Sequence, residues 1–194
     1  MESLRREDLF SLEDYAARRT EFRSRVLAHK RNRTLGIGAN VTLLFEDRLT
    51  IQYQIQEMLR VERIFEPAGI QDELDAYNPV IPDGRNWKAT MLIEFPDVEE
   101  RKRALARLVG IEHNVWFQVA GCERITALAD EDLDRATPEK TAAVHFLRVD
   151  LDAASVAALK DGASLAVGVD HQQYRHAVDP VADEIRMSLV GDLD

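Results

Sequence analysis

Two pairs of short strand-like segments, each joined by a tight glycine turn, constrain the fold of this 194-residue chain most strongly. The two turns are Gly38-Ala39-Asn40, between residues 34–38 and 41–45, and Gly121-Cys122, between residues 115–120 and 124–128. Turns this short join antiparallel neighbours, because a parallel pair needs a crossover of about a dozen residues or more. The sequence therefore predicts two hairpins and favours an antiparallel sheet.

Further strands and several helices are indicated by the spacing of apolar residues. We predict strands at residues 87–95, 142–151 and 164–169, and leave residues 171–176 unassigned. We predict helices at residues 12–31, 48–65, 70–77, 97–110, 152–160 and 181–190. Together these patterns indicate an α+β fold, a mostly antiparallel sheet packed with helices. We expect one compact unit over residues 1–194, with the basic N-terminal helix in residues 1–33 as a peripheral element. A parallel α/β arrangement is the alternative, and it fits the two hairpins less well.

Nothing in the sequence directs the chain to a membrane or to an oxidising compartment. No apolar run reaches the ~18 residues of a membrane span, and the start MESLRREDLF carries mixed charge in place of an apolar signal region. The single cysteine, Cys122, excludes an internal disulfide and a metal site made of cysteines alone. We therefore expect a cytoplasmic protein.

Charge is distributed unevenly along the chain. The formal net charge is −10, which argues against general nucleic-acid binding. Residues 18–33, however, contain seven Lys or Arg residues and a single Glu. This basic segment can bind an anionic partner, the acidic body of its own chain, or a second copy in a homo-oligomer. The sequence leaves these three possibilities open.

The predicted helix at residues 48–65 carries polar residues on more than one face. One narrow stripe, expected to face water, contains four of them: Gln52, Gln56, Arg60 and Arg63. Three others fall within the wide apolar arc: Gln54, Glu57 and Glu62. Charged side chains are rarely buried without a partner, so these three are candidate ligand-binding residues or members of an internal polar network.

Glu57 and Glu62 are five residues apart on this helix, so their side chains diverge and cannot share one small site. Gln54 and Glu57 are three residues apart and can act together. In the structural alternative, Glu57 or Glu62 pairs with an interior arginine, for which Arg85 and Arg148 are candidates. Arg148 is also a candidate ligand-binding residue. Simple surface exposure is the third possibility.

The segment YNPVIPDGRNW, at residues 77–87, is the best candidate for a binding loop. It contains four candidate ligand-binding residues: Asn78, Asp83, Arg85 and Trp87. Two prolines stiffen the segment, which would reduce the entropy lost on binding. A well-anchored structural connection would have the same composition.

Three histidines are the candidate metal ligands. A mononuclear site for iron or another divalent metal could combine His145, His171 and His176 with Glu57 or Glu62. His171 and His176 could reach one ion only across a turn, because five residues on a strand place them on opposite faces. In the alternative, His145 is hydrogen-bonded in the core and the other two lie on a loop. The signatures of phosphate loops, nucleophile elbows and zinc-protease helices are absent from the sequence.

Several blocks of the chain resemble an uncharacterised bacterial family, the domain of unknown function 3501. The blocks are LLFEDRLTIQYQIQEMLRVERIF, ELDAYNPVIPDG, VEERKRALARLVGIE, TAAVHFLRVDL and GVDHQQYRH, which extend over most of residues 9–176. The family has no assigned activity to carry over. The resemblance implies an association with rubrerythrin-like and iron–sulfur oxidoreductase proteins, and hence a role near peroxide defence or redox metabolism.

Three functions remain open from the sequence. The first is a binding or accessory protein for redox partner proteins, acting through residues 77–87 and the polar helix. The second is a metal-dependent enzyme, with iron as the expected metal. The third is an anion or nucleotide binder that uses the basic helix.

Overall fold

The computed structural model describes residues 2–129 and 140–194 and has an α+β architecture with two antiparallel sheets. The first sheet has the strand order β1-β2-β3-β7-β6, and the second has the order β5-β4-β8-β9. The strands of the first sheet are β1 (Thr34–Ile37), β2 (Val41–Glu46), β3 (Asn86–Ile93), β6 (Leu128–Ala129) and β7 (Val144–Asp150). The strands of the second are β4 (Val115–Val119), β5 (Arg124–Thr126), β8 (Leu165–His171) and β9 (Tyr174–Val178).

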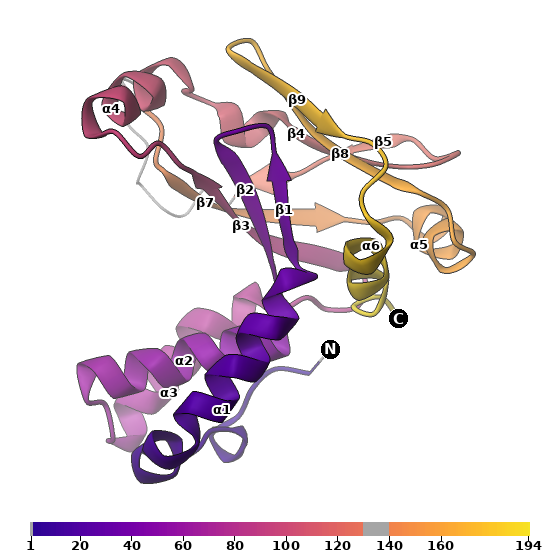
Figure 1. Ribbon diagram of the computed structural model, residues 1–194. Coiled ribbons are helices and arrows are strands. Elements are labelled where there is room, and N and C mark those ends of the chain that lie inside the picture. The colour runs from indigo at the N-terminus through magenta and orange to yellow at the C-terminus, as the bar shows by residue number, and fades with distance from the viewer. Residues whose placement is uncertain (1, 130–139) are drawn as a thin grey trace.

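Helices surround the two sheets, and three of them form a separate layer. This helical layer contains α1 (Leu12–Arg31), α2 (Arg48–Glu62) and α3 (Pro67–Tyr77), which lie together below the sheets in Figure 1. The other helices are α4 (Val98–Arg107), α5 (Ala153–Lys160) and α6 (Asp183–Val190). Short 3₁₀ turns are η1 (Arg6–Asp8), η2 (Asn78–Val80) and η3 (Ile111–Asn114). No helix in the described ranges is long and apolar enough to cross a membrane.

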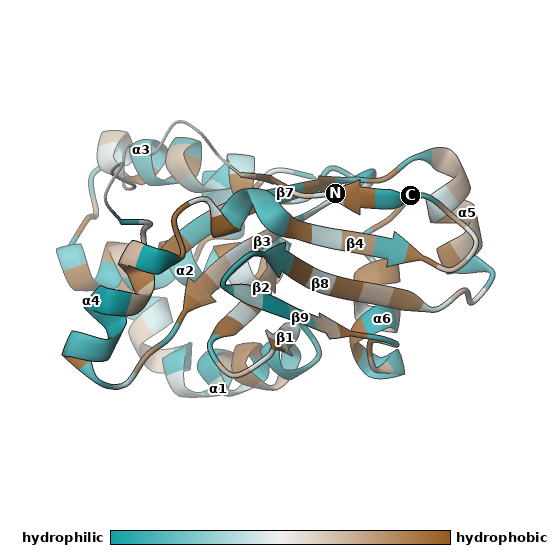
Figure 2. Cartoon of the chain, turned by 90° about the horizontal axis from the view of Figure 1, so that it is seen from above, coloured by the Kyte–Doolittle hydropathy of each residue, from teal (hydrophilic) through white to brown (hydrophobic). Residues whose placement is uncertain are grey.

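The main core lies between the two sheets. Inward positions alternate along β2, where Val41, Leu43 and Phe45 are buried. Phe45 and Phe117 pack with ring centroids 6.1 Å apart, so the two sheets meet through aromatic contacts. Figure 2 shows β8 as a largely hydrophobic strand and α4 as a largely hydrophilic helix. Smaller apolar clusters lie within the helical layer.

The two sheets are joined at one corner and hydrogen-bonded at the opposite one. The chain runs from β5 directly into β6, so consecutive residues pass from the second sheet into the first. At the opposite corner, Tyr174 of β9 donates its hydroxyl hydrogen to the Ile37 carbonyl at 2.6 Å. The same oxygen accepts the amide hydrogens of Asn40 and Val41. Tyr174 therefore links β9 to the β1–β2 turn.

The structure confirms the α+β fold and both predicted hairpins, and it changes several boundaries. The predicted helix at residues 48–65 ends at Glu62, because Arg63 is left-handed with a φ of 55°. Pro67 then starts α3 three residues earlier than predicted, which agrees with the preference of proline for a first helical turn. The unassigned residues 171–176 include the end of β8, a turn at residues 172–173 and the start of β9, and so belong to a β8–β9 hairpin. The single-unit assignment stays a prediction.

Candidate functional site

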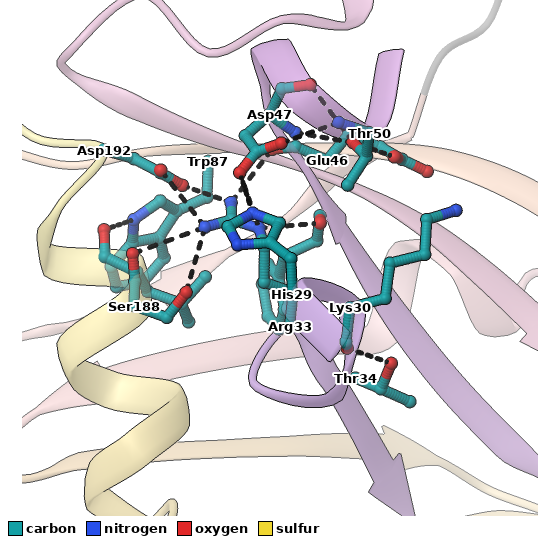
Figure 3. A network of polar contacts seen from close by, with 12 residues as sticks. His29, Lys30, Arg33, Thr34, Glu46, Asp47, Thr50, Trp87, Ser188 and Asp192 are labelled. Carbon is teal, nitrogen blue, oxygen red and sulfur yellow. Dashed lines mark hydrogen bonds and ion pairs between the residues drawn. The ribbon is translucent and has the colours of Figure 1, made fainter. Parts of the chain in front are cut away.

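A buried arginine, Arg33, connects the end of α1 to the end of β2 and to residues 188 and 192 near the C-terminus (Figure 3). It follows α1 and is 2% exposed. Its Nε donates to the Phe45 carbonyl at 3.0 Å, and its Nη2 donates to the Glu46 carbonyl at 3.0 Å. Nη1 and Nη2 both reach the Asp192 carboxylate, and Nη1 also donates to Ser188. Every nitrogen of the guanidinium is thus engaged by the protein itself, which leaves no nitrogen uncommitted for a ligand.

A second carboxylate, Asp47, lies on the other side of Arg33. Its Oδ2 is 3.4 Å from Arg33 Nε and 2.5 Å from His29 Nε2. Its Oδ1 accepts the Thr50 amide hydrogen at 2.9 Å and so caps α2. Burial raises the pKa of Asp47, but Arg33, the Thr50 amide and His29 outweigh burial and hold that pKa below its usual value. Asp47 therefore stays ionised as the helix cap.

The two acids that contact Arg33, Asp47 and Asp192, differ in their environments. Burial raises the pKa of Asp192 above its usual value, although Arg33 opposes the effect. Around Arg33, His29 has the most exposed side chain, at 33%. Arg33, Asp47, Asp192 and His29 were not among the predicted site residues. Asp192 lies 159 residues from Arg33 in the sequence, so no local pattern could have joined them.

Glu57 has an arginine partner, but not one of those predicted. Arg19 of α1 binds both of its carboxylate oxygens, each at 2.8 Å. The buried Tyr15 hydroxyl donates to Glu57 at 2.6 Å, and Arg60 completes the cluster at 3.2 Å. The Arg19 hydrogen bonds lower the pKa of Glu57 to about 2, against the opposing effect of burial. Glu57 therefore holds α1 on α2 as an ionised carboxylate.

The interior partners predicted for Glu57 or Glu62 were wrong. Arg85 and Arg148 are both exposed, and Arg148 pairs instead with Asp150, at 3.1 Å. Arg85 follows a turn that exposes it, and Arg148 lies on the outward side of β7, opposite the buried residues of that strand. Glu62 is exposed and has no polar partner among the described residues.

The predicted water-facing stripe of α2 was also wrong for its glutamines. Gln56 is fully buried, and its amide contacts both the N–H and the C=O of Phe10. Gln52 donates to the Asp8 carbonyl at 2.6 Å. Residues 4–10 cover the two glutamines of this stripe, whereas Gln54 is exposed. Gln56 can be buried because its amide satisfies main-chain groups of the covering segment.

We expect the Glu57→Gln substitution to lower the free energy of unfolding at pH 7 and to matter progressively less in acid. The pKa of Glu57 in the folded protein, about 2, lies below its ordinary value of 4.5. Its ionised form therefore contributes stability above pH 4.5 that is lost as the pH falls towards 2. Urea unfolding of both proteins between pH 7 and pH 3 measures the difference.

Glu62→Gln is the matched control, since Glu62 lies on the same helix without a polar partner among the described residues. This variant should follow the wild type at every pH. A Glu57→Gln penalty that stays constant down to pH 3 would contradict the expectation.

The candidate binding loop at residues 77–87 is anchored at several points. Asn78 contacts both the N–H and the C=O of Leu4, at 2.8 and 2.9 Å. Asp83 accepts hydrogen bonds from the Arg85 amide and from the Asn86 side chain. Trp87 is 1% exposed and donates to the Leu189 carbonyl at 2.9 Å. Three of the four loop candidates thus hold the fold together, which is the structural alternative.

The candidate metal ligands do not converge. His145 lies on β7 of the first sheet, next to Thr141 and the Ala142 carbonyl, each at 2.9 Å. His171 ends β8 and His176 lies within β9, opposite Val169, both in the second sheet. Burial lowers the pKa of His145. Within residues 2–129 and 140–194, no three His, Cys, Asp or Glu side chains form a group that could hold a metal ion.

Comparisons with known proteins place the chain in one family. A solved structure titled as a novel protein of unknown function, from Burkholderia pseudomallei K96243, is 50% identical and has a TM-score of 0.93. The alignment covers 100% of both chains. Among curated proteins, no significant match was found. The model of one family, described as protein of unknown function (DUF3501), matches residues 3–193. The chain therefore belongs to the DUF3501 family.

Proposed function

We propose that this protein is a cytoplasmic accessory protein that binds an acidic partner protein through the outward face of α1. One observation carries the proposal: four arginines on this helix are exposed and form no ion pair with any described residue. They are Arg18, Arg23, Arg25 and Arg31. Two other arginines of the basic segment, Arg19 and Arg33, instead bind acids of the same chain. Four uncompensated arginines on a protein with a net charge of −10 favour an acidic partner.

Two of these arginines are already oriented. The Arg18 guanidinium lies over the Phe10 ring, 5.5 Å from its centroid, and the Arg25 guanidinium lies over Phe22 at 5.2 Å. Seven residues separate them, so they lie about 10 Å apart along the helix axis. An arginine held against a ring loses less side-chain entropy when it pairs with a carboxylate. The spacing suits acidic side chains two turns apart on a partner helix.

The resemblance noted in the sequence suggests which partners to try first. We propose a rubrerythrin-like protein or an iron–sulfur oxidoreductase as the partner. The exposed, pre-oriented arginines support a binding role, and the chemistry of the partner rests on the resemblance alone. The iron-enzyme alternative has less support, because the candidate ligands lie in different sheets. Metal analysis of the protein purified without chelators would test that alternative.

Reversing the charge of two α1 arginines should weaken partner binding. We expect Arg18→Glu with Arg25→Glu, the two oriented arginines, to lower the affinity for the purified rubrerythrin-like or iron–sulfur protein roughly tenfold or more. The matched control is Arg107→Glu with Arg175→Glu, which changes the net charge equally at exposed sites on other elements. Surface plasmon resonance at two salt concentrations measures both, and higher salt should weaken wild-type binding.

Two results would contradict the proposal. One is equal loss of affinity in the control variant, which would assign binding to net charge. The other is absence of binding to either partner by the wild-type chain.

A second candidate function uses the same arginines to bind a nucleotide or polyphosphate. Stabilisation of the wild type by polyphosphate in thermal unfolding, lost with Arg18→Glu and Arg25→Glu, would favour that function.

A further inference from the structure

Residues 4–10 lie on the helical layer as a bound peptide would. Side-chain amides hold both ends of the segment through its main chain: Asn78 contacts the N–H and C=O of Leu4, and Gln56 those of Phe10. Gln52 adds a third main-chain contact, to the Asp8 carbonyl. Amides that reach both the N–H and the C=O of one residue recognise a peptide independently of that residue's side chain.

Two side chains of the segment add specificity. Leu4 is 3% exposed and belongs to an apolar cluster with residues of α2 and α3, including Ile55 and Leu74. The Asp8 carboxylate lies 2.7 Å from the Arg48 guanidinium at the start of α2. The rest of the segment is largely exposed at Arg5, Arg6 and Glu7. The surface therefore selects an apolar anchor followed four residues later by an acid.

The segment does not fill the surface on which it lies. Beside it remains a hollow of about 390 Å³, bordered by Arg6 and residues 9–13 on one side and by the end of α2, the start of α3 and their connection on the other. Phe65, which borders the hollow, is 70% exposed, and Val61 one turn earlier is 59% exposed. Apolar surface of this kind, next to a bound segment, is typical of a docking groove that accepts a larger ligand.

We propose that the surface formed by α2, α3 and η2 is a groove for a peptide segment of a partner protein with the pattern Leu-x-x-x-Asp-x-Phe. Residues 4–10 of this chain occupy the groove as a tethered competitor. Charge complementarity between Arg48 and the acid, and the apolar pocket that now holds Leu4, define the ligand. This inference concerns a surface other than the outward face of α1 and does not depend on the proposed function.

The tether sets how strongly the internal segment competes. A ligand attached through a few residues has an effective concentration on the order of millimolar. A free peptide must overcome this concentration in the wild-type chain. Weakening the internal segment, without changing the groove, should therefore increase the affinity for the same peptide added from outside.

The test uses a fluorescein-labelled synthetic peptide with the sequence of residues 2–11, ESLRREDLFS, and the full-length chain. We expect Leu4→Ala with Asp8→Ala to increase peptide affinity roughly tenfold or more over the wild type. Adding Asn78→Ala and Arg48→Ala, which remove groove contacts, should abolish that gain. A peptide with its leucines and aspartate replaced by alanine is the ligand control. Fluorescence anisotropy measures each affinity.

Trypsin cleavage after Arg5 and Arg6 reports whether the segment has been released. Faster cleavage of the Leu4→Ala and Asp8→Ala chain without any peptide binding would overturn the proposal. Dimerisation of that chain without peptide binding would assign the groove to a second copy and would also overturn it. If the variant does not fold, amide exchange of Leu4 and Phe10 in the wild type decides. Both amides should exchange faster with excess peptide, and unchanged exchange would refute the groove.

Discussion

Replacing Arg33 with methionine is expected to lower the free energy of unfolding by about 3–5 kcal/mol. The substitution removes the positive charge that lies between the buried carboxylates of Asp47 and Asp192. It also leaves the Phe45 and Glu46 carbonyls without the donors that now bind them. Because a buried charge without a partner costs much more than the pair contributes, the loss should be large. Urea unfolding followed by circular dichroism measures it.

Two further variants separate the causes of this loss. Arg33→Lys keeps the charge but cannot reproduce the forked contacts, so we expect an intermediate loss. Adding Asp192→Asn to Arg33→Met removes one of the two uncompensated charges, and part of the stability should return. If Arg33→Met alone lowers the free energy of unfolding by less than about 1 kcal/mol, the contacts of Arg33 do not stabilise the fold as expected.

Replacing Trp87 with alanine should also cost about 3–5 kcal/mol. Trp87 is 1% exposed and packs against Phe45 and Phe117, with ring centroids 6.3 and 6.0 Å away. Its indole nitrogen donates to the Leu189 carbonyl, which anchors α6 to the core. The alanine variant therefore creates a cavity and loses this anchor. Thermal and urea unfolding measure the change.

Trp87→Phe is the matched variant for the same position. It keeps an aromatic ring in the core and loses the hydrogen bond to Leu189, so the penalty should be about 1–2 kcal/mol. The sequence suggested Trp87 as a ligand-binding residue within a loop. If Trp87→Ala left stability unchanged and affected only binding of a partner, that earlier hypothesis would be supported and the structural role refuted.

Local patterns predicted most of the fold. The glycine turns at Gly38 and Gly121 both have positive φ, of 69° and 82°, and both join antiparallel strands as expected. Helix α1 begins and ends where the sequence placed it, and Ser11 caps its first turn. The end of α2 was less predictable. Arg63 adopts a left-handed conformation that glycine usually takes, so no residue type marked the boundary.

The polar contacts were harder to predict, because they depend on long-range packing. An arginine partner for Glu57 was one of three possibilities that the sequence left open, but Arg19 on α1 could be identified only once α1 was placed against α2. The sequence predicted that Gln52 and Gln56 on α2 face water, because the analysis of helix faces assumes that only apolar side chains become covered. Here the main chain of residues 4–10 covers it, and Gln56 is buried to bind that main chain.

The corner formed by Tyr174 differs in kind from the opposite corner of the two sheets. On one side, continuous chain passes from β5 into β6, so that corner cannot separate without unfolding a strand. On the other side, the hydroxyl of Tyr174 bridges Ile37 to Asn40 and Val41. The two sheets are thus joined at one edge by the continuous chain and at the opposite edge by the hydrogen bonds of Tyr174. Transient opening of the core to water should therefore begin at the edge that Tyr174 holds, while the edge where β5 continues into β6 stays closed.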